Sequence, residues 1–274
     1  MPERACGPRF WVGCAAVFVI AGLIVSWPSL GYYWAWDDLH LIRAYSRQEL
    51  LGTLMGNWDP DHIETPGFRP LTTFFNHVRA KWFGEHVVLH RLFLVGLFSA
   101  FLTLLGSAAV RLGEHRWAVL LAGIMAVTAK NSYYHFVWIT DGNHGLQAVF
   151  FAVAVHVLLR YLDTGTPWSL LGTLLFALFA FATREDSLVT VPVMLLVAYH
   201  HVNAGRDGCV ERSARAVPAM PARLRNFVAG LFVITALFWM WRSAAVPDAG
   251  QFDPAAPVFT RVGTMMLWTV CLSG

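Results

Sequence analysis

The sequence predicts an all-α, polytopic membrane protein, and three observations point to this class. Of its 274 residues, 57% are hydrophobic and only 14% are charged, whereas soluble domains have about 45–50% apolar and about 25% charged residues. Apolar segments recur along the chain, and several approach the roughly 20 residues that a membrane-spanning helix needs. Arginines are concentrated in every second loop between these segments, as the positive-inside rule requires of the cytoplasmic loops. The formal net charge of +3 is small and gives no sign of nucleic-acid binding.

The first apolar segment, residues 10–30, is predicted to be an uncleaved signal-anchor helix. It is longer than the apolar core of a cleaved signal peptide, which has about 7–15 residues. An aromatic run at 32–36 follows it instead of a small-residue cleavage site. Aromatic residues of this kind gather at membrane–water interfaces, so we expect the helix to end there.

Residues 31–86 form a long loop that is predicted to carry amphipathic helices. The apolar residues that recur at helical spacing are Leu71, Phe74, Phe75, Val78 and Trp82, and the opposite side carries Thr72, Asn76 and Arg79. Pro70 suits the first position of this helix. Such a helix is expected to lie in the outer membrane interface. Residues 39–55 suggest a second, less regular one.

Further membrane segments follow, giving seven or eight in all. They are predicted at 87–110, 117–129, 145–162, 168–182, 187–201, 227–243 and 258–273. The third, fifth and sixth segments are short, and their polar ends are expected to line a cavity, where irregular backbone is tolerated. Residues 1–274 are interpreted as one transmembrane domain. Because the last apolar segment stops abruptly, we expect a C-terminal part to be missing.

Basic residues predict the orientation. With a cytoplasmic N-terminus, the inside loops carry Arg111, Arg116, Arg160, Arg206, Arg212, Arg215, Arg223 and Arg225. The short outside loops carry only Lys130 and Arg184. This distribution is typical of the positive-inside rule. The loop 31–86 is therefore expected to face the extracytoplasmic side, in a bacterial inner membrane.

Two adjacent carboxylates, Asp37 and Asp38, follow the first segment. One interpretation is a helix cap with an acidic first turn. The other is a general base that acts on an acceptor hydroxyl, with the second acid orienting it or holding a cation, since two close like charges raise one pKa. His40 is near, but two carboxylates and one imidazole are too few ligands to predict a metal. The four cysteines form no CxxC pair and signal neither zinc nor a disulfide framework.

Five further residues are predicted to share the outer side: Arg69, Lys130, Asp141, Arg184 and Glu185. Each has a structural alternative. Arg69 either pairs with an acid or a lipid headgroup, or grips a substrate phosphate. Lys130 faces a cavity or snorkels outward. Asp141 lies in a polar turn, and Arg184 with Glu185 forms either a local ion pair or part of a functional site. Together these charges suit a reaction with an anionic leaving group, such as a lipid phosphate.

The order of the motifs resembles the GT-C superfamily of integral membrane glycosyltransferases. This group includes protein O-mannosyltransferases, the aminoarabinose transferase of lipid A, and mannosyltransferase-like proteins, some with tetratricopeptide repeats, together with their bacterial relatives. The resemblance is carried by Asp37 and Asp38, residues 68–71, His90, residues 138–142, residues 183–186 and Pro192.

The resemblance implies roles for individual residues. Asp37 would be the catalytic carboxylate, with Asp38 in support. The donor would be a dolichyl- or undecaprenyl-phosphate sugar, transferred with inversion to a hydroxyl of a protein, lipid or glycan. Arg69 and Arg184 would bind the lipid phosphate, and Glu185 would hold Arg184 or the sugar. A divalent metal is conceivable but not favoured.

Two other classes of function remain open. A transporter or flippase could use the same charges in an outward cavity. A protein of this class predicts charged residues deep within its helices and two halves of similar sequence. The sequence shows few such charges and no repeat. A non-catalytic relative or fragment that serves as an assembly partner predicts that Asp37→Asn has no effect.

Overall fold

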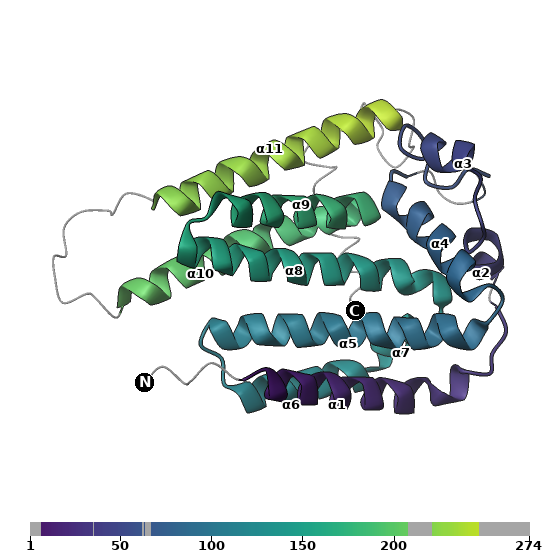
Figure 1. The fold of residues 1–274 in the computed structure, drawn as a ribbon, viewed down its shortest axis with the longest axis horizontal. Helices are drawn as coiled ribbons and strands as arrows, with labels where there is room; N and C mark the ends of the chain where they lie inside the picture. The colour runs from purple at the N-terminus through teal and green to yellow at the C-terminus, as the bar shows by residue number, and fades with distance from the viewer. Residues whose placement is uncertain (1–6, 35, 62, 64–66, 208–220, 247–274) are drawn as a thin grey trace.

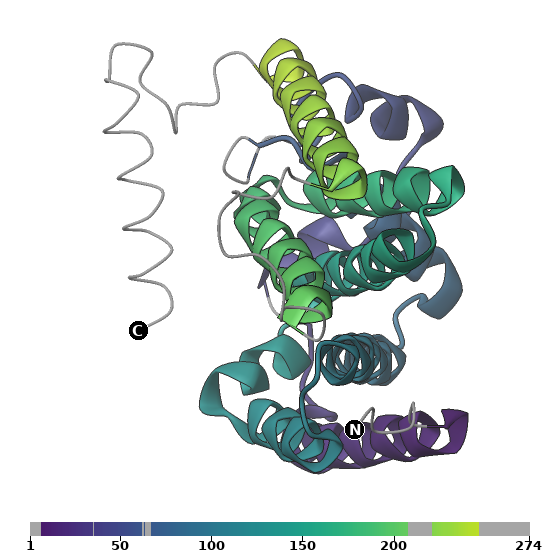
Figure 2. The same cartoon turned by 90° about the vertical axis from the view of Figure 1, so that its left-hand side faces the viewer.

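The computed structural model describes residues 7–34, 36–61, 63, 67–207 and 221–246, and within these ranges the chain is all-α without any β-strand. This confirms the all-α part of the predicted fold class. Long helices lie side by side, and the helices between residues 36 and 83 cover one end of the bundle (Figure 1). Figure 2 views the helices nearly end-on, with α1 at the bottom of the stack and α11 at the top.

Eleven α-helices and three short 3₁₀ helices make up the described part of the chain. The first half contains α1 (Pro8–Ser26), η1 (Trp27–Ser29), α2 (Trp36–Leu41), α3 (Arg47–Gly52), α4 (Pro70–Phe83), α5 (Val87–Arg111) and α6 (Arg116–Thr128). The second half contains α7 (Lys130–Val137), η2 (Ile139–Asp141), α8 (Gly142–Thr164), α9 (Pro167–Thr183), η3 (Glu185–Val189), α10 (Thr190–Asp207) and α11 (Ala222–Ala245). Each predicted apolar segment up to residue 243 falls almost entirely on one α-helix or on an α-helix and the adjoining 3₁₀ helix. The predicted segment 258–273 lies outside the described residues.

Among the described residues, four helical stretches are long and apolar enough to cross a membrane: Pro8–Ser29, Val87–Arg111, Ile139–Thr164 and Ala222–Ala245. They indicate a membrane protein. The predicted seven or eight spans exceed this number, because α6 and α9 have only 13 and 17 residues. Helices of that length fall short of the usual spanning length, so the larger count stays a prediction.

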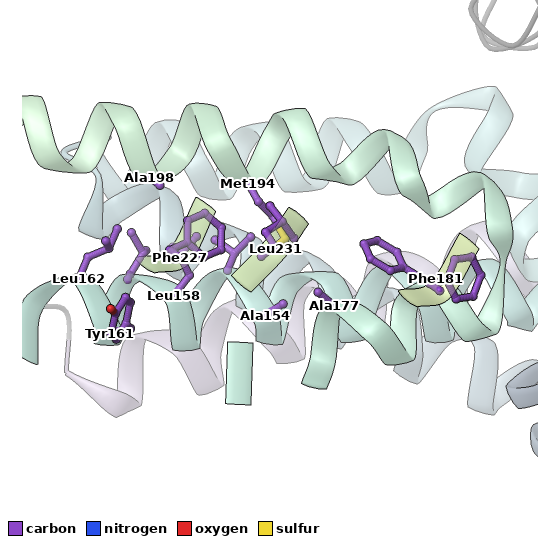
Figure 3. Packing of buried hydrophobic residues seen from close by; sticks show 14 of the residues in the cluster. Ala154, Leu158, Tyr161, Leu162, Ala177, Phe181, Met194, Ala198, Phe227 and Leu231 are labelled. Carbon is purple, nitrogen blue, oxygen red and sulfur yellow. The ribbon is translucent and has the colours of Figure 1, made fainter. Parts of the chain in front are cut away.

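The larger apolar core lies between α8, α9, α10 and α11. Leu158 on α8, Phe181 on α9, Met194 on α10 and Phe227 on α11 are fully buried. Figure 3 shows these side chains between the four helices. Within a bilayer, close packing rather than removal from water holds such helices together. This core fixes the ends of α8 and α9 relative to each other.

A second core joins α1 to α5, α6 and α7. Phe18, Val95, Val127 and Phe136 form its centre, each at most 2% exposed. Gly123 on α6 lies directly against the ring of Phe18, where a Cβ atom would clash with the ring. Small residues at helix crossings allow this close approach in membranes. The N-terminal helix is therefore an integral part of the bundle.

Helix α4 turns its polar face inward. Thr72, Asn76 and Arg79 are at most 1% exposed, whereas Phe74 and Trp82 are 54% and 71% exposed. Pro70 occupies its first turn, as predicted. The helical spacing thus predicted correctly which residues share each face. The exposed apolar face fits the predicted position in a membrane interface. The buried polar face is what joins this helix to the candidate site.

Charged residues also gather at the opposite end of the bundle. There, the end of α5 meets the end of α8, near the start of α11 (Figure 1). Asp163 accepts hydrogen bonds at 2.8 Å from Arg111 Nη2 and from His201 Nε2. Arg223 Nη1 donates to the carbonyl oxygens of Leu162 and Asp163, both at 2.7 Å. Arginines predicted to lie on the cytoplasmic side thus share one end of the molecule.

Candidate functional site

Asp38 joins the segment between α1 and α4 to the turn before α8. Its side chain is fully buried, and its Oδ1 accepts hydrogen bonds from the backbone N–H and from the hydroxyl of Thr140, both at 2.7 Å. These bonds give Asp38 a structural role next to Asp37. The side chain of Asp37 lies outside the described part of the chain.

Arg79 holds the same turn from the other side. Its two terminal nitrogens both donate to the carbonyl oxygen of Ile139, each at 3.1 Å. Burial lowers the pKa of Arg79 to about 9, and the negative charge of Asp38 acts in the opposite direction. The two buried charges therefore lie near each other and fix η2 between α4 and α2.

Arg91 forms hydrogen bonds with the backbone of the segment that follows the first helix. It lies in the first turns of α5 and is 1% exposed. Its guanidinium donates to the carbonyl oxygens of Leu30, Tyr32 and Tyr33 at 3.3, 2.5 and 3.1 Å. Neighbouring His90 is buried between the rings of Trp34 and Phe83. The sequence analysis did not single out Arg91, because no local pattern indicates the bonds that it makes.

The start of α4 packs against the loop after α9. The hydroxyl of Thr72 donates to the carbonyl oxygen of Thr183 at 2.6 Å. The guanidinium carbon of Arg69 lies 5.1 Å from the ring centre of Trp58. A Cβ on Gly67 would be 2.9 Å from Oε1 of Glu185, so only the backbone of residue 67 fits there. These contacts bring Arg69 and Glu185 to the same end of the bundle.

Arg184 and Glu185 do not pair with each other. Glu185 Oε2 lies 2.7 Å from Nε of Arg242 on α11, with side chains 13% and 7% exposed. Arg184 Nη2 instead lies 3.0 Å from Oδ2 of Asp186. Burial acts to raise the pKa of Asp186, but the charge and hydrogen bonds of Arg184 outweigh it and lower that pKa. The resemblance implied that Glu185 would hold Arg184 or the sugar. Its ion-pair partner is Arg242, and a role toward the sugar stays a prediction.

Asp141 lies between two imidazoles. Its Oδ2 contacts Nδ1 of His135 on α7, and its Oδ1 lies 3.1 Å from Nε2 of His144 on α8. The side chain of Asp141 is 16% exposed, and those of His135 and His144 are 39% and 37% exposed. Sequence reasoning found the acid but not its partners. The separation of 135, 141 and 144 follows no motif, because a helix, a turn and a second helix bring them together.

Three of the five predicted outer charges, Arg69, Asp141 and Arg184, act on one another or on Asp186. The charge of Arg184 acts on both Asp141 and Asp186, and the charge of Arg69 acts on Asp186. Glu185 pairs with Arg242, and Lys130 is separate from the group. It is the exposed first residue of α7, and no hydrogen bond or ion pair links it to these residues within the described ranges.

A different set of residues could hold a metal ion. Ligand atoms of His40, Asp59 and Asp61 lie within 4.8 Å of one another. However, Asp59 also accepts hydrogen bonds from the backbone N–H groups of Asp61 and Ile63, at 3.1 and 2.8 Å. Asp61 is paired with Arg43 at 2.9 Å. Because protein groups already satisfy both acids, the arrangement gives no reason to add a metal, and its absence stays a prediction.

Comparison with known proteins reveals no relationship, since no protein-family model, curated protein or solved structure matches the chain. The resemblance to the GT-C superfamily therefore stays a prediction. Function has to be argued from the residues and their geometry.

Proposed function

We propose that the protein is an integral membrane glycosyltransferase that moves a sugar from a polyprenyl-phosphate donor to an acceptor hydroxyl. The observation that carries the proposal is the gathering of cations and acids from three separate segments at one end of an apolar bundle. The residues are Arg69 before α4, Asp141 in η2, and Arg184 with Asp186 around η3. Such ionisable clusters in membrane proteins mark functional sites more often than structural ones.

Asp37 is the proposed general base. Its neighbour Asp38 is fully buried and engaged with Thr140, which suits support rather than proton transfer. The acceptor oxygen attacks the anomeric carbon while Asp37 takes its proton. The bond from that carbon to the phosphate oxygen breaks, and its electron pair leaves with the phosphate. Arg69 and Arg184 stabilise the negative charge that develops there.

The proposed orientation puts this site on the extracytoplasmic face of a bacterial inner membrane, in a multi-pass protein with a cytoplasmic N-terminus. In support, Arg111 and Arg223 lie at the end of the bundle away from the site. The exposed Phe74 and Trp82 on α4 suit contact with the outer interface and with the lipid part of the donor. No metal is part of the proposal.

A transfer assay tests the proposal directly. Membranes that contain the full chain are incubated with a panel of polyprenyl-phosphate sugars and candidate hydroxyl acceptors. Asp37→Asn is expected to lower transfer by about 10²–10⁴-fold, the usual contribution of a general base, without affecting membrane insertion.

The matched control is Glu85→Gln, which removes an exposed acid from the same outer loop and is expected to leave transfer unchanged. Undiminished transfer by Asp37→Asn overturns the assignment of the base. Absence of transfer by the wild type with every donor overturns the proposed function and favours the non-catalytic alternative.

A further inference from the structure

The end of the bundle away from the candidate site is strongly basic. It is formed by the starts of α1, α6, α9 and α11 and by the ends of α5, α8 and α10 (Figure 1). Among the side chains that the structure describes there, six exposed arginines outnumber two acids, Glu114 and Asp163. The arginines, which we call the basic end, are Arg9, Arg111, Arg116, Arg160, Arg223 and Arg225. The excess of four positive charges favours a negatively charged partner.

Two of these arginines are engaged within the protein. Arg111 donates to Asp163 at 2.8 Å, and Arg223 donates to two backbone carbonyl oxygens at the end of α8, both at 2.7 Å. Within the described ranges, no acid pairs with the other four arginines of the basic end. Their charge is therefore not neutralised by the side chains described there and is available to a ligand.

Arg116 lies over two aromatic rings at the start of α6. Its guanidinium carbon is 5.8 Å from the ring centre of Phe10 on α1 and 5.5 Å from that of Trp117. The two rings meet edge to face, with centres 5.8 Å apart. Cation–π contacts of this kind hold a guanidinium and leave its N–H donors available. Arg116 can thus present two parallel donors to one phosphate group.

An exposed apolar stripe begins beside Arg116 and follows α6. It consists of Trp117, Leu121 and Met125, each more than half exposed. Their spacing of four residues places them on one face of the helix. In a bilayer such a face contacts acyl chains, and a tryptophan at its end lies at the level of the headgroups.

Helix α9 repeats this arrangement at the same end of the bundle. Trp168 lies in its first turn, and Leu171 and Leu175 continue along the same face, all three of them exposed. Two exposed tryptophans, each at the start of an apolar helix, thus accompany the arginines. Basic and aromatic residues together are typical of the level at which a membrane protein meets lipid headgroups.

We propose that the basic end binds an anionic phospholipid, with the lipid phosphate at Arg116 and an acyl chain along the stripe of Trp117, Leu121 and Met125. The ligand is a lipid rather than a free anion, because the apolar stripe continues directly from the cation. The other arginines attract the net negative charge of the lipid. A zwitterionic lipid carries the same phosphate, but the arginines repel its ammonium group, so it binds more weakly.

The proposal does not depend on the proposed glycosyltransferase function, because the two sites lie at opposite ends of the bundle (Figure 1). Binding of an anionic lipid here requires only that the chain is inserted in a bilayer. The test can therefore be made without knowledge of a sugar donor.

Lipid selectivity tests the proposal. The full chain is delipidated in detergent and mixed with equal amounts of phosphatidylglycerol and phosphatidylcholine that carry the same acyl chains. Native mass spectrometry then counts the lipids that stay bound. The wild type is expected to retain phosphatidylglycerol over phosphatidylcholine by about tenfold or more, and Arg116→Gln is expected to lower this ratio about fivefold, the effect of one basic residue near a charged lipid surface.

Two further variants define the site. Arg47→Gln is the matched control, because it removes an exposed arginine at the other end of the bundle; the ratio is expected to stay unchanged. Trp117→Leu keeps the apolar stripe but removes one ring beneath the guanidinium of Arg116, so the ratio is expected to fall about twofold. If Arg116→Gln does not fold, Trp117→Leu carries the test.

Three outcomes overturn the proposal. The first is equal retention of the two lipids by the wild type. The second is an equal loss of selectivity in Arg116→Gln and Arg47→Gln, because any surface arginine would then suffice. The third is competition by glycerol phosphate that is as effective as competition by phosphatidylglycerol, which would indicate a site for a free anion. Each of these outcomes leaves the transfer assay with Asp37→Asn unaffected.

Discussion

Asp38 and Arg79 hold opposite sides of one peptide group, the group that joins Ile139 to Thr140. Asp38 accepts a hydrogen bond from its N–H at 2.7 Å, and Arg79 donates two bonds to its carbonyl oxygen at 3.1 Å. Residues 38 and 140 are 102 positions apart in the sequence. Two buried, opposite charges thus replace water around a turn that directly precedes α8. The positions of Asp141 and His144 depend on this arrangement.

Asp38→Asn is therefore expected to destabilise the fold, in contrast to Asp37→Asn, which is expected to affect activity alone. Removing one charge of a buried opposite pair costs about 3–5 kcal/mol, because the other charge stays buried without compensation. The free energy of unfolding in detergent micelles measures this effect. Thr140→Val is the control: it removes only the hydroxyl contact and is expected to cost about 2 kcal/mol. Equal losses from the two variants would contradict the role given to the charge of Asp38.

The fold class and the helix positions were predictable because they depend on local patterns. Apolar segments locate the long helices within a few residues, and Pro70 begins α4 as its position indicates. The number of spans was harder to predict. An apolar run of 13 residues such as α6 identifies a helix, but its sequence alone does not settle whether that helix crosses a bilayer. Which face of α4 is buried also depends on its neighbours.

The candidate site was only partly predictable. Asp141 and Arg184 stood out because charged residues between apolar segments are unusual. Their partners did not, because an ion pair is decided by tertiary structure. Arg242 is the clearest case: it lies in the last turn of an apolar helix and gives no local sign of a bond to Glu185. The contact of His135 with Asp141 likewise has no local sign in the sequence, because only the turn of the chain at η2 brings the two residues together.

The Glu185–Arg242 pair is expected to couple α11 to the loop after α9. Both side chains are largely buried, at 13% and 7% exposure, so Glu185→Gln and Arg242→Met are each expected to cost about 3–5 kcal/mol. A double-mutant cycle in detergent is expected to give a coupling free energy of about 1–3 kcal/mol.

The control cycle is the Arg184–Asp186 pair, in which Asp186 is 56% exposed. Solvent screens such a pair, so its coupling is expected to stay below about 1 kcal/mol. A larger coupling in the exposed pair than in the buried one would contradict the structural role of Arg242.

Glu49 is expected to make the start of α3 sensitive to acid. Hydrogen bonds from the backbone N–H of Ser46, and then from Arg43, lower the pKa of Glu49 from 4.5 to about 2. A lowered pKa in the folded state means that the stabilisation is complete above pH 4.5 and is lost as the pH falls toward about 2. Hydrogen exchange of the α3 amides is expected to accelerate over this range in the wild type.

Glu49→Gln is expected to exchange faster at neutral pH and to lose this acid dependence. Arg43→Gln keeps the reciprocal Ser46–Glu49 bonds of the capping box and is expected to retain most of it. An unchanged acid dependence in Glu49→Gln would show that another acid controls the opening of α3.

Gly142 is expected to be intolerant of even one added carbon, because it touches the same arginine that holds the turn. A Cβ atom there would lie 2.6 Å from Cδ2 of Leu94 and 2.8 Å from Nη1 of Arg79. Both side chains are at most 2% exposed, and Arg79 is fixed by Ile139, so neither moves cheaply. Gly142→Ala is expected to cost about 1–3 kcal/mol.

The control is Gly96→Ala on α5, where the added carbon meets nothing within 4 Å. This variant should be neutral or stabilising by up to about 1 kcal/mol, because alanine favours helices. Thermal unfolding in detergent compares the two, and similar values would mean that Arg79 can leave the turn at little cost.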